Sequence, residues 1–281
     1  MKRLSAILVG IVLLGLIPAN SKIYDFSKAY KETRPVSGFT GISLSGSCRV
    51  LFTPSDKYEV ILEGDKDDVT KYVTDMQGGV LRLYMPSVDE SGDGVKRFFG
   101  HLVNSVSSDI TECNVRIRVS APNISSLSVS GSGEIEVMKD WTSDSDIEAS
   151  IAGSSEIIMR NLTAQSFSVK ISGSGKFSSG TVQTAKAVSV KSSGSGSLEF
   201  DVVKAKTVEM STAGSGDVRI ETADISDRLD VKMAGSGDLR INGKAGHVVI
   251  NISGSGSVKG RLAYDSIDST SSGSGKIKLS K

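Results

Sequence analysis

A Gly-Ser-Gly tripeptide recurs at a nearly constant interval along this chain of 281 residues. Its eight copies begin at Gly131, Gly153, Gly173, Gly194, Gly214, Gly235, Gly254 and Gly273. The successive intervals are 22, 20, 21, 20, 21, 19 and 19 residues, and only the second copy departs from the pattern, reading Gly-Ser-Ser. A fixed period of this length is typical of stacked-repeat proteins, in which each unit packs only on its neighbours. We therefore expect a rigid rod, whose activity lies on the side wall, at an end, or where the repeat is interrupted.

Apolar and polar residues alternate on both sides of each tripeptide. Counted from the first Gly, positions −6, −4, −2, +4 and +6 hold 33 apolar residues out of 40. The intervening positions −5, −3, +3 and +5 hold only two apolar residues out of 32, Ile158 and Val249. A period of two predicts β-strands with one buried face. Because no unit shows a helical period, we expect an all-β solenoid, a parallel β-helix of about 20 residues per coil.

The same alternation places both Gly residues of the corner inward and the Ser between them outward. An inward corner leaves little room for a Cβ atom, and glycine also tolerates φ > 0. The tripeptide is therefore interpreted as a packing solution rather than a site. In the last copy, Ser269 and Ser271 stand where most other copies are apolar, which is expected of a polar capping coil.

The N-terminus has the pattern of a secretory signal. Two basic residues precede an apolar run over 4–17, and small residues follow. We expect a signal peptide over 1–21, an N-terminal arm over 22–35 and one β-helix domain over 36–281. The apolar run is too short for a comfortable membrane span, so the mature chain is expected to be exported, without a transmembrane anchor, to the periplasm, the cell surface or the medium. A net charge of +1 argues against nucleic acid as a partner.

The N-terminal part of the domain contains the same unit in altered form. Residues 42–52 match residues 127–137, with Cys48 in place of the second Gly of the corner. We therefore expect altered coils over 36–120 and regular Gly-Ser-Gly coils over 121–281.

Two departures from the coil pattern are predicted in these first coils. A short helix is expected over 65–74, because Asp65 is a favourable N-cap and acidic residues follow it. Residues 81–85 and 115–119 alternate like the two halves of one coil. The corner between these halves is replaced by an insertion over 86–111.

The two cysteines fall at equivalent places in this register. Cys113 stands two residues before Val115, as Cys48 stands two residues before Val50. If Val50 and Val115 lie side by side, the cysteines are close enough for a disulfide, and an exported protein is in an oxidising compartment. The alternative is two unrelated buried thiols.

The insertion has the pattern of an amphipathic helix. Its apolar residues run from Val95 to Val106 at spacings of 3, 1, 3, 1 and 3, which gives one apolar face that includes Phe98, Phe99 and Leu102. One interpretation is a helix packed on the rod, as a lid over an exposed strand edge. The other is a partner-binding element, since inserts at one corner of a repeat often carry binding.

No motif indicates catalysis, a cofactor or a metal site. The only histidines, His101 and His247, have no cysteine or carboxylate at metal-ligand spacing. Gly-Lys pairs lack the remaining residues of a phosphate-binding loop. Serine is so frequent that proximity to a histidine would carry no signal for nucleophilic catalysis.

Acidic residues recur in the outward column at +3, at Glu134, Glu156, Asp217 and Asp238. Paired carboxylates in adjacent coils are a candidate arrangement for glycan acid/base chemistry. The alternative is a solvated face, on which Asp217 pairs with Arg219 and Asp238 pairs with Arg240. Trp141, alone in a loop, is a candidate for stacking on a sugar or for anchoring that loop.

An ordered series of motifs extends over 36–281. It comprises Val36-Ser37-Gly38-Phe39, Ile42-x-Leu44-Ser45-Gly46-Ser47, Val60-x-Leu62, Leu81-x-Leu83, Val115-x-Ile117-x-Val119-x-Ala121-Pro122-x-Ile124, and Leu127-x-Val129-Ser130-Gly131-Ser132-Gly133. In this order the motifs resemble the head-domain family of autotransporter adhesins, envelope proteins common in Bacteroidota. The resemblance implies a right-handed single-stranded β-helix and an exported protein, and it supplies no catalytic residues.

Three functions remain open from the sequence. The leading one is a non-enzymatic envelope or surface protein that binds a protein or glycan ligand, with Phe98, Phe99, Leu102 and Trp141 as candidate partner-binding residues. The second is a glycan-binding or glycan-active β-helix, and the third is a periplasmic structural or signalling module. Homo-oligomerisation is left open, and no cofactor is expected.

Overall fold

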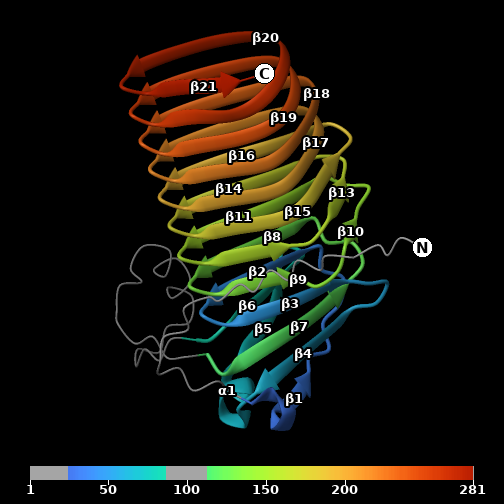
Figure 1. Ribbon diagram of the computed structural model, residues 1–281. Coiled ribbons are helices and arrows are strands. Elements are labelled where there is room, and N and C mark those ends of the chain that lie inside the picture. Colours follow the sequence, from blue (N-terminus) through green and yellow to red (C-terminus); the bar gives the residue numbers. More distant parts are fainter. Residues whose placement is uncertain (1–24, 87–112, 281) are drawn as a thin grey trace, which may run out of the picture.

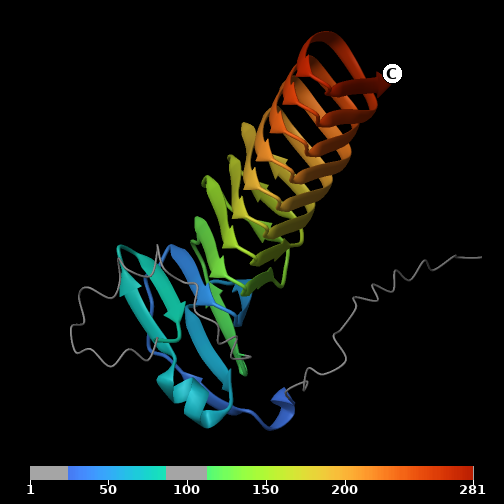
Figure 2. The ribbon, with the colours of Figure 1, turned by 90° about the vertical axis from the view of Figure 1, so that its left-hand side faces the viewer.

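The computed structural model describes residues 25–86 and 113–280, and it is a β-solenoid of about eight turns. Coils lie one on the next with their corners in line, so the rod is built as the period predicts (Figures 1 and 2). The expected signal peptide over 1–21 and the expected helix containing Phe98, Phe99 and Leu102 lie outside the described residues. No helix in the described part is long and apolar enough to cross a membrane.

Two walls of parallel strands meet at the Gly-Ser-Gly corner. The wall before the corner, here the serine wall, contains β6 (Val80–Tyr84), β2 (Gly41–Gly46), β8 (Ser126–Gly131), β11 (Ile147–Gly153), β14 (Phe167–Gly173) and β16 (Ala187–Gly194) in spatial order. The wall after the corner, here the charged wall, contains β7 (Val115–Ala121), β3 (Arg49–Pro54), β9 (Glu134–Val137), β12 (Glu156–Met159) and β15 (Lys176–Thr184), and ends with β21 (Lys276–Ser280).

The C-terminal coils are formed by strands that run round both walls. These are β17 (Ser197–Gly214), β18 (Asp217–Gly235), β19 (Asp238–Gly254) and β20 (Ser257–Gly273). A third, narrow side carries β10 (Trp141–Thr142) and β13 (Leu162–Ala164), which pair with each other. All three sides enclose one apolar core, because every second side chain points inward.

The core is filled by stacked columns of like residues. Val169, Val190, Met210 and Val231 form one such column through four successive coils. The rings of Phe167, Phe177 and Phe200 also touch in series, with centroids 5.6 and 5.3 Å apart. Phe167 and Phe177 flank the corner at Gly173 and Phe200 follows the next corner, so these contacts join two neighbouring coils.

The two glycines of the corner are required for different reasons. Both were expected to point inward, but only the second does. The first has φ between +82° and +129° in all eight corners and is exposed or half-buried. The second is largely buried, and a Cβ there would meet backbone or core atoms of the preceding coil, as at Gly237, 2.1 Å from the carbonyl oxygen of Gly216. The first glycine is required by backbone conformation and the second by space.

The corners are also tied by hydrogen bonds along the rod. In seven of them the Ser N–H donates to the carbonyl oxygen of the first Gly of the preceding corner, at 2.8–3.0 Å. Ser155 occupies the second-Gly position of the irregular corner. It is buried, and its hydroxyl donates to the carbonyl oxygen of Ala152 at 3.1 Å. The hydroxyl that this serine adds in place of glycine is therefore not left without a hydrogen-bond partner.

The N-terminal end is closed by antiparallel structure. Strand β1 (Tyr30–Thr33) pairs with β4 (Glu59–Gly64), which pairs with β7, and β5 (Val73–Gln77) pairs with β6. A 3₁₀ turn, η1 (Phe26–Lys28), precedes β1, and the predicted helix is present as α1 (Lys66–Lys71), with the Asp65 carboxylate accepting from the backbone N–H of Asp67. These elements cover the base of the rod (Figure 2).

Chain order and spatial order differ here. The coil made of β6 and β7 adjoins the coil made of β2 and β3, as expected, but it lies on the N-terminal side of that coil, while β8 and β9 lie on its other side. The expected register was two residues wrong, because Val50 pairs with Ile117 rather than with Val115. Cys48 and Cys113 nevertheless form the predicted disulfide, with Cα atoms 5.1 Å apart.

A buried carboxylate fastens the antiparallel strands. Glu63 of β4 is 2% exposed and lies 3.2 Å from Lys31 Nζ, 2.6 Å from Arg116 Nη2 and 3.1 Å from Arg118 Nε. Burial raises the pKa of Glu63, but hydrogen bonds from Arg116, Lys31 and Arg118 outweigh it and hold that pKa below its ordinary value. Three strands, β1, β4 and β7, are thereby held by one side chain.

Candidate functional site

The serine wall presents a row of three serines and one glutamate in register. Ser126, Glu148, Ser168 and Ser189 lie opposite one another in β8, β11, β14 and β16. Each stands five residues before the first Gly of its corner, so the row is a direct product of the sequence period. The row runs along the rod rather than along a strand.

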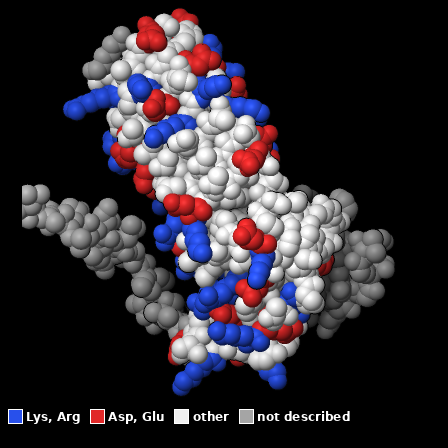
Figure 3. Space-filling model, turned by 90° about the vertical axis from the view of Figure 1, so that its right-hand side faces the viewer, with Lys and Arg blue, Asp and Glu red and all other residues white. Residues whose placement is uncertain are grey.

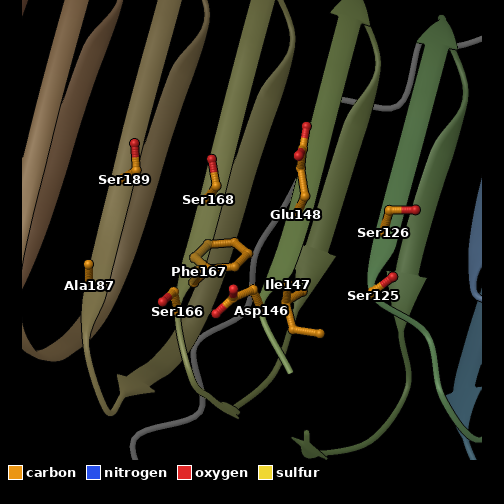
Figure 4. Close-up of a pocket in the computed structure, with 10 residues that line it drawn as sticks. All are labelled: Ser125, Ser126, Asp146, Ile147, Glu148, Ser166, Phe167, Ser168, Ala187 and Ser189. Carbon is orange, nitrogen blue, oxygen red and sulfur yellow. The ribbon is translucent and has the colours of Figure 1, made fainter. Parts of the chain in front are cut away.

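A shallow groove of about 450 Å³ opens over the beginning of these four strands. Figure 4 shows its residues in two rows, with the side chains of Glu148 and Ser168 directed away from the ribbon. Five serines, Asp146, Glu148 and Ala187 line it, and the buried side chains of Ile147 and Phe167 form its floor. The groove therefore offers hydroxyl and carboxylate groups over a thin apolar base.

The electrostatics of the groove are mildly acidic. Glu148 accepts a hydrogen bond from Lys170 Nζ at 2.7 Å, and both side chains are 47% exposed. Asp146 is exposed at the entrance to β11. Elsewhere charges of both signs are mixed, and the middle of the side facing the viewer in Figure 3 is largely uncharged. A mixed surface of this kind does not favour a nucleic acid.

The acidic column of the charged wall is occupied by structural bonds. The Asp217 carboxylate accepts from the backbone N–H of Asp238 at 2.9 Å, and the Asp238 carboxylate accepts from both the N–H and the hydroxyl of Ser257. Hydrogen bonds from Ser257 and Lys259 lower the pKa of Asp238. Both carboxylates are fixed as acceptors for the next coil, and the lowered pKa of Asp238 keeps it ionised, so neither is a good candidate for a general acid.

The expected ion pairs on this wall are also different. Arg219 pairs with Glu221 rather than with Asp217, and Lys259 pairs with Asp238 at 3.1 Å in place of Arg240. Strand alternation explains the first change, because residues two apart on one strand lie on the same face in either direction.

Glu134 and Glu156 lie opposite each other in β9 and β12. Arg49 of β3 contacts both Glu134, at 3.0 Å, and Glu136. Burial raises the pKa of Glu134, and the charges of Glu156 and Glu136 add to that rise, whereas Arg49 opposes it. The raised pKa of Glu134 beside Glu156 is a property that a general acid would need. However, the ion pair with Arg49 holds Glu134 against the neighbouring strand β3.

The structure brings together one constellation that sequence reasoning passed over. His247 Nδ1 lies 2.7 Å from Ser266 Oγ, and its Nε2 lies 3.4 Å from Asp268 Oδ2. These residues belong to β19 and β20, and Asp268 is 78% exposed on the open surface. The only available signal was the stacking of positions one repeat apart. We assign the contact to fastening β20 on β19.

The sequence-predicted partner-binding residues are placed as follows. Trp141 is 2% exposed and packs edge-to-face on Phe52, with ring centroids 5.4 Å apart. Its position fits the loop anchor, and a binding role for it stays a prediction. Phe98, Phe99 and Leu102 lie outside the described residues. No group of three or more His, Cys, Asp or Glu side chains suited to a metal ion occurs within 25–86 and 113–280.

The stacked walls, the closed N-terminal end and the open polar groove define a β-solenoid protein. The sequence matches the family model described as "Putative auto-transporter adhesin, head GIN domain" over residues 38–227 and 220–281. The chain therefore belongs to the family of auto-transporter adhesin head domains. None of the curated proteins matches it.

Solved structures with the same fold include proteins from Parabacteroides and Bacteroides. One from Parabacteroides distasonis, described as a "putative lipid binding protein", has a TM-score of 0.71 at 22% identity, with 90% of this chain and 97% of that one covered. A "putative adhesin" from Parabacteroides merdae has a TM-score of 0.71 at 12% identity, with coverages of 91% and 97%. Another from Bacteroides fragilis has a TM-score of 0.60 at 19% identity, with coverages of 90% and 97%. These likenesses show the fold.

Proposed function

We propose that this protein is a non-catalytic scaffold, exported to the cell envelope, which binds an extended neutral glycan along the groove of the serine wall. The observation that carries the proposal is the groove itself, which crosses four strands with hydroxyls at the repeat spacing. The family membership and the secretory pattern at 1–21 support export and an adhesin-like role. The right-handed sense of the coil, which the family resemblance implies, is part of the same proposal.

The chemistry of the groove fits sugar hydroxyls. A serine hydroxyl both donates and accepts hydrogen bonds, and a carboxylate accepts them, so Ser126, Glu148 and Ser168 can satisfy a chain of hydroxyl groups. Neighbouring strands are about 4.8 Å apart, so contacts repeat along a linear ligand. The rigid wall holds these groups in place before binding, which reduces the entropy lost on association.

A lipid ligand fits this groove less well. One structural neighbour is described as a lipid-binding protein, but an acyl chain requires an apolar lining. Here Ile147 and Phe167 are buried beneath a polar rim. An acyl chain would leave the hydroxyls and carboxylates of that rim unpaired.

The proposal is tested by filling the groove. Purified wild-type protein and the variants Ser168→Tyr and Ser211→Tyr are passed over immobilised neutral polysaccharides, including dextran, mannan, xylan and chitin oligomers. Ser168 lines the groove, whereas Ser211 is exposed on the same wall in β17 and outside it. We expect binding to at least one glycan that Ser168→Tyr abolishes and Ser211→Tyr retains.

Two results would contradict the proposal. One is the absence of binding to every glycan, or binding that survives Ser168→Tyr. The other is release of reducing ends from a bound glycan that is lost in Glu148→Gln or Glu134→Gln, which would make the protein an enzyme. Protease treatment of intact cells tests location, because a surface protein is cleaved there and a periplasmic module is protected.

A further inference from the structure

Four cations are stacked in register at the C-terminal end of the charged wall. Arg219, Arg240, Lys259 and Lys278 occupy the same position in β18, β19, β20 and β21 and lie directly opposite one another. All four are exposed. At the usual spacing of neighbouring strands, the column extends for about 14 Å along the rod. These strands are the last coils in Figure 1.

The residues at this column position are not basic along the whole rod. Nearer the N-terminus the same position holds Glu136, Ile158, Ser178 and Glu199. The basic run is therefore confined to the last four strands and is not a general property of the repeat.

Two of the four cations have no acidic partner among residues 25–86 and 113–280. Arg219 pairs with Glu221, and Lys259 with Asp238. Within the described residues, no carboxylate lies at ion-pair distance from Arg240 or Lys278.

The surroundings strengthen the positive charge toward the end of the rod. On the outward face of the charged wall, β20 carries Lys259 and Arg261, and β21 carries Lys276 and Lys278, with no acidic residue among them. The nearest carboxylate, Asp238, is already bonded to Ser257 and Lys259.

Like charges directly opposite on neighbouring strands destabilise a sheet. A column of four is therefore not explained by folding, since small hydroxyls would pack there without repulsion. Sites that weaken a fold without a structural gain are typical of functional surfaces. The repulsion is relieved when an external chain of negative charge lies along the column.

We propose that this basic column binds an acidic polysaccharide, a linear chain with one carboxylate or sulfate on each sugar. The column is one residue wide, so it matches a linear polyanion better than the flat charged surface of a membrane. An anionic membrane laid on this wall would also approach Glu199, which adjoins the N-terminal end of the column, and Glu221, which lies beside Arg219. The site lies on the opposite side of the corner from the serine-wall groove and does not depend on it.

The test compares two variants with equal loss of charge. Arg240→Gln with Lys278→Gln removes the two unpaired cations of the column. Lys191→Gln with Lys232→Gln removes two exposed lysines from the serine wall as a matched control. The ligands are polygalacturonate, neutral dextran, and phosphatidylglycerol vesicles, and binding of the full chain is measured from about 20 to 300 mM salt, a range over which screening strengthens steeply.

We expect wild-type protein to bind polygalacturonate and not dextran, with an affinity that falls as salt rises. The column variant should bind at least about tenfold more weakly, with its logarithmic salt slope reduced by about two, whereas the control keeps both. Circular dichroism establishes that the variants are folded, and Arg240→Lys should retain binding.

Three outcomes would overturn the proposal. They are the absence of polygalacturonate binding at low salt, an equal loss in both double variants, and binding to vesicles through the column without binding to polygalacturonate. The last would assign the column to a lipid surface. A failure of the groove experiment leaves these measurements unaffected, because the variants lie on different walls.

Discussion

Replacing Gly214 by alanine tests the double requirement at the corner. Gly214 has φ of +119°, and a Cβ there would lie 2.3 Å from the carbonyl oxygen of Gly194 and 3.0 Å from its carbon. Both neighbours are backbone atoms of the preceding coil, so they cannot rotate away as a side chain could. We expect Gly214→Ala to be destabilising through backbone strain and through crowding together.

Gly46 provides a control that separates these two causes. It also has φ of +119°, but none of the described atoms lies within 4 Å of the position its Cβ would take. Strain at such a φ costs about 1–3 kcal/mol, and overpacking adds about 1–3 kcal/mol. Gly46→Ala should therefore lower the free energy of unfolding by about 1–3 kcal/mol, and Gly214→Ala by about 2–6 kcal/mol.

Urea unfolding followed by circular dichroism measures the difference. With an m-value of about 3 kcal/mol per M, the midpoint should fall by about 0.3–1 M for Gly46→Ala and by about 0.7–2 M for Gly214→Ala. Stacked repeats can lose cooperativity, so the slope is compared as well as the midpoint. If Gly214→Ala is no less stable than Gly46→Ala, backbone crowding does not limit the corner and the reasoning is refuted.

Three further changes test other parts of the rod. Glu63→Gln should lower the free energy of unfolding at neutral pH by about 2–3 kcal/mol. Because the pKa of Glu63 is lowered in the folded protein, the ionised carboxylate stabilises the fold above the ordinary pKa of 4.5. This stabilisation is lost as the pH falls through the lower folded pKa. An acid-unfolding profile of the variant as steep as that of wild type would contradict this. Replacing Cys48 and Cys113 by alanine should lower the free energy of unfolding by about 4 kcal/mol, because the disulfide closes a loop of 65 residues in the unfolded chain. A thermal midpoint equal to that of the wild type would contradict this prediction. Ile157→Ala, in a fully buried position, should cost about 2–5 kcal/mol, whereas Ile277→Ala, half-buried in the last strand, should cost less than half as much; equal losses would show that the terminal coil is covered.

The repeat and its alternation were sufficient to predict the walls, the core and the line of corners. They were insufficient at the corner itself, because alternation assigns a direction to each side chain only where the backbone is extended. The first Gly interrupts that backbone with its positive φ, so counting by twos gives the wrong face at that residue alone. The second Gly faces the core as predicted.

The N-terminal coils could not be ordered from the sequence. Residues 81–85 and 115–119 carry the correct alternation, but nothing in it states on which side of Ile42 and Val50 they pack. That choice depends on the antiparallel strand β4 and on the Glu63 cluster, which bring β7 beside β3. The serine-wall groove was not predicted either, since its shape arises from the start of four strands rather than from any one motif.

The register of the two walls explains why columns of side chains persist although the repeat length varies from 19 to 22 residues. Where the strands run continuously round the rod, the irregularities in pairing fall at Ala205/Thr207, Ile220/Ala223 and Ile225/Arg228, between the charged wall and the serine wall. The third side thus absorbs the extra or missing residues, and both walls keep Gly opposite Gly. Any residue repeated at a fixed distance from the corner must then form a column, whether of serines or of cations. A one-residue insertion on the third side should leave both proposed binding surfaces intact, whereas one within a wall would turn every later side chain of that strand to the opposite face.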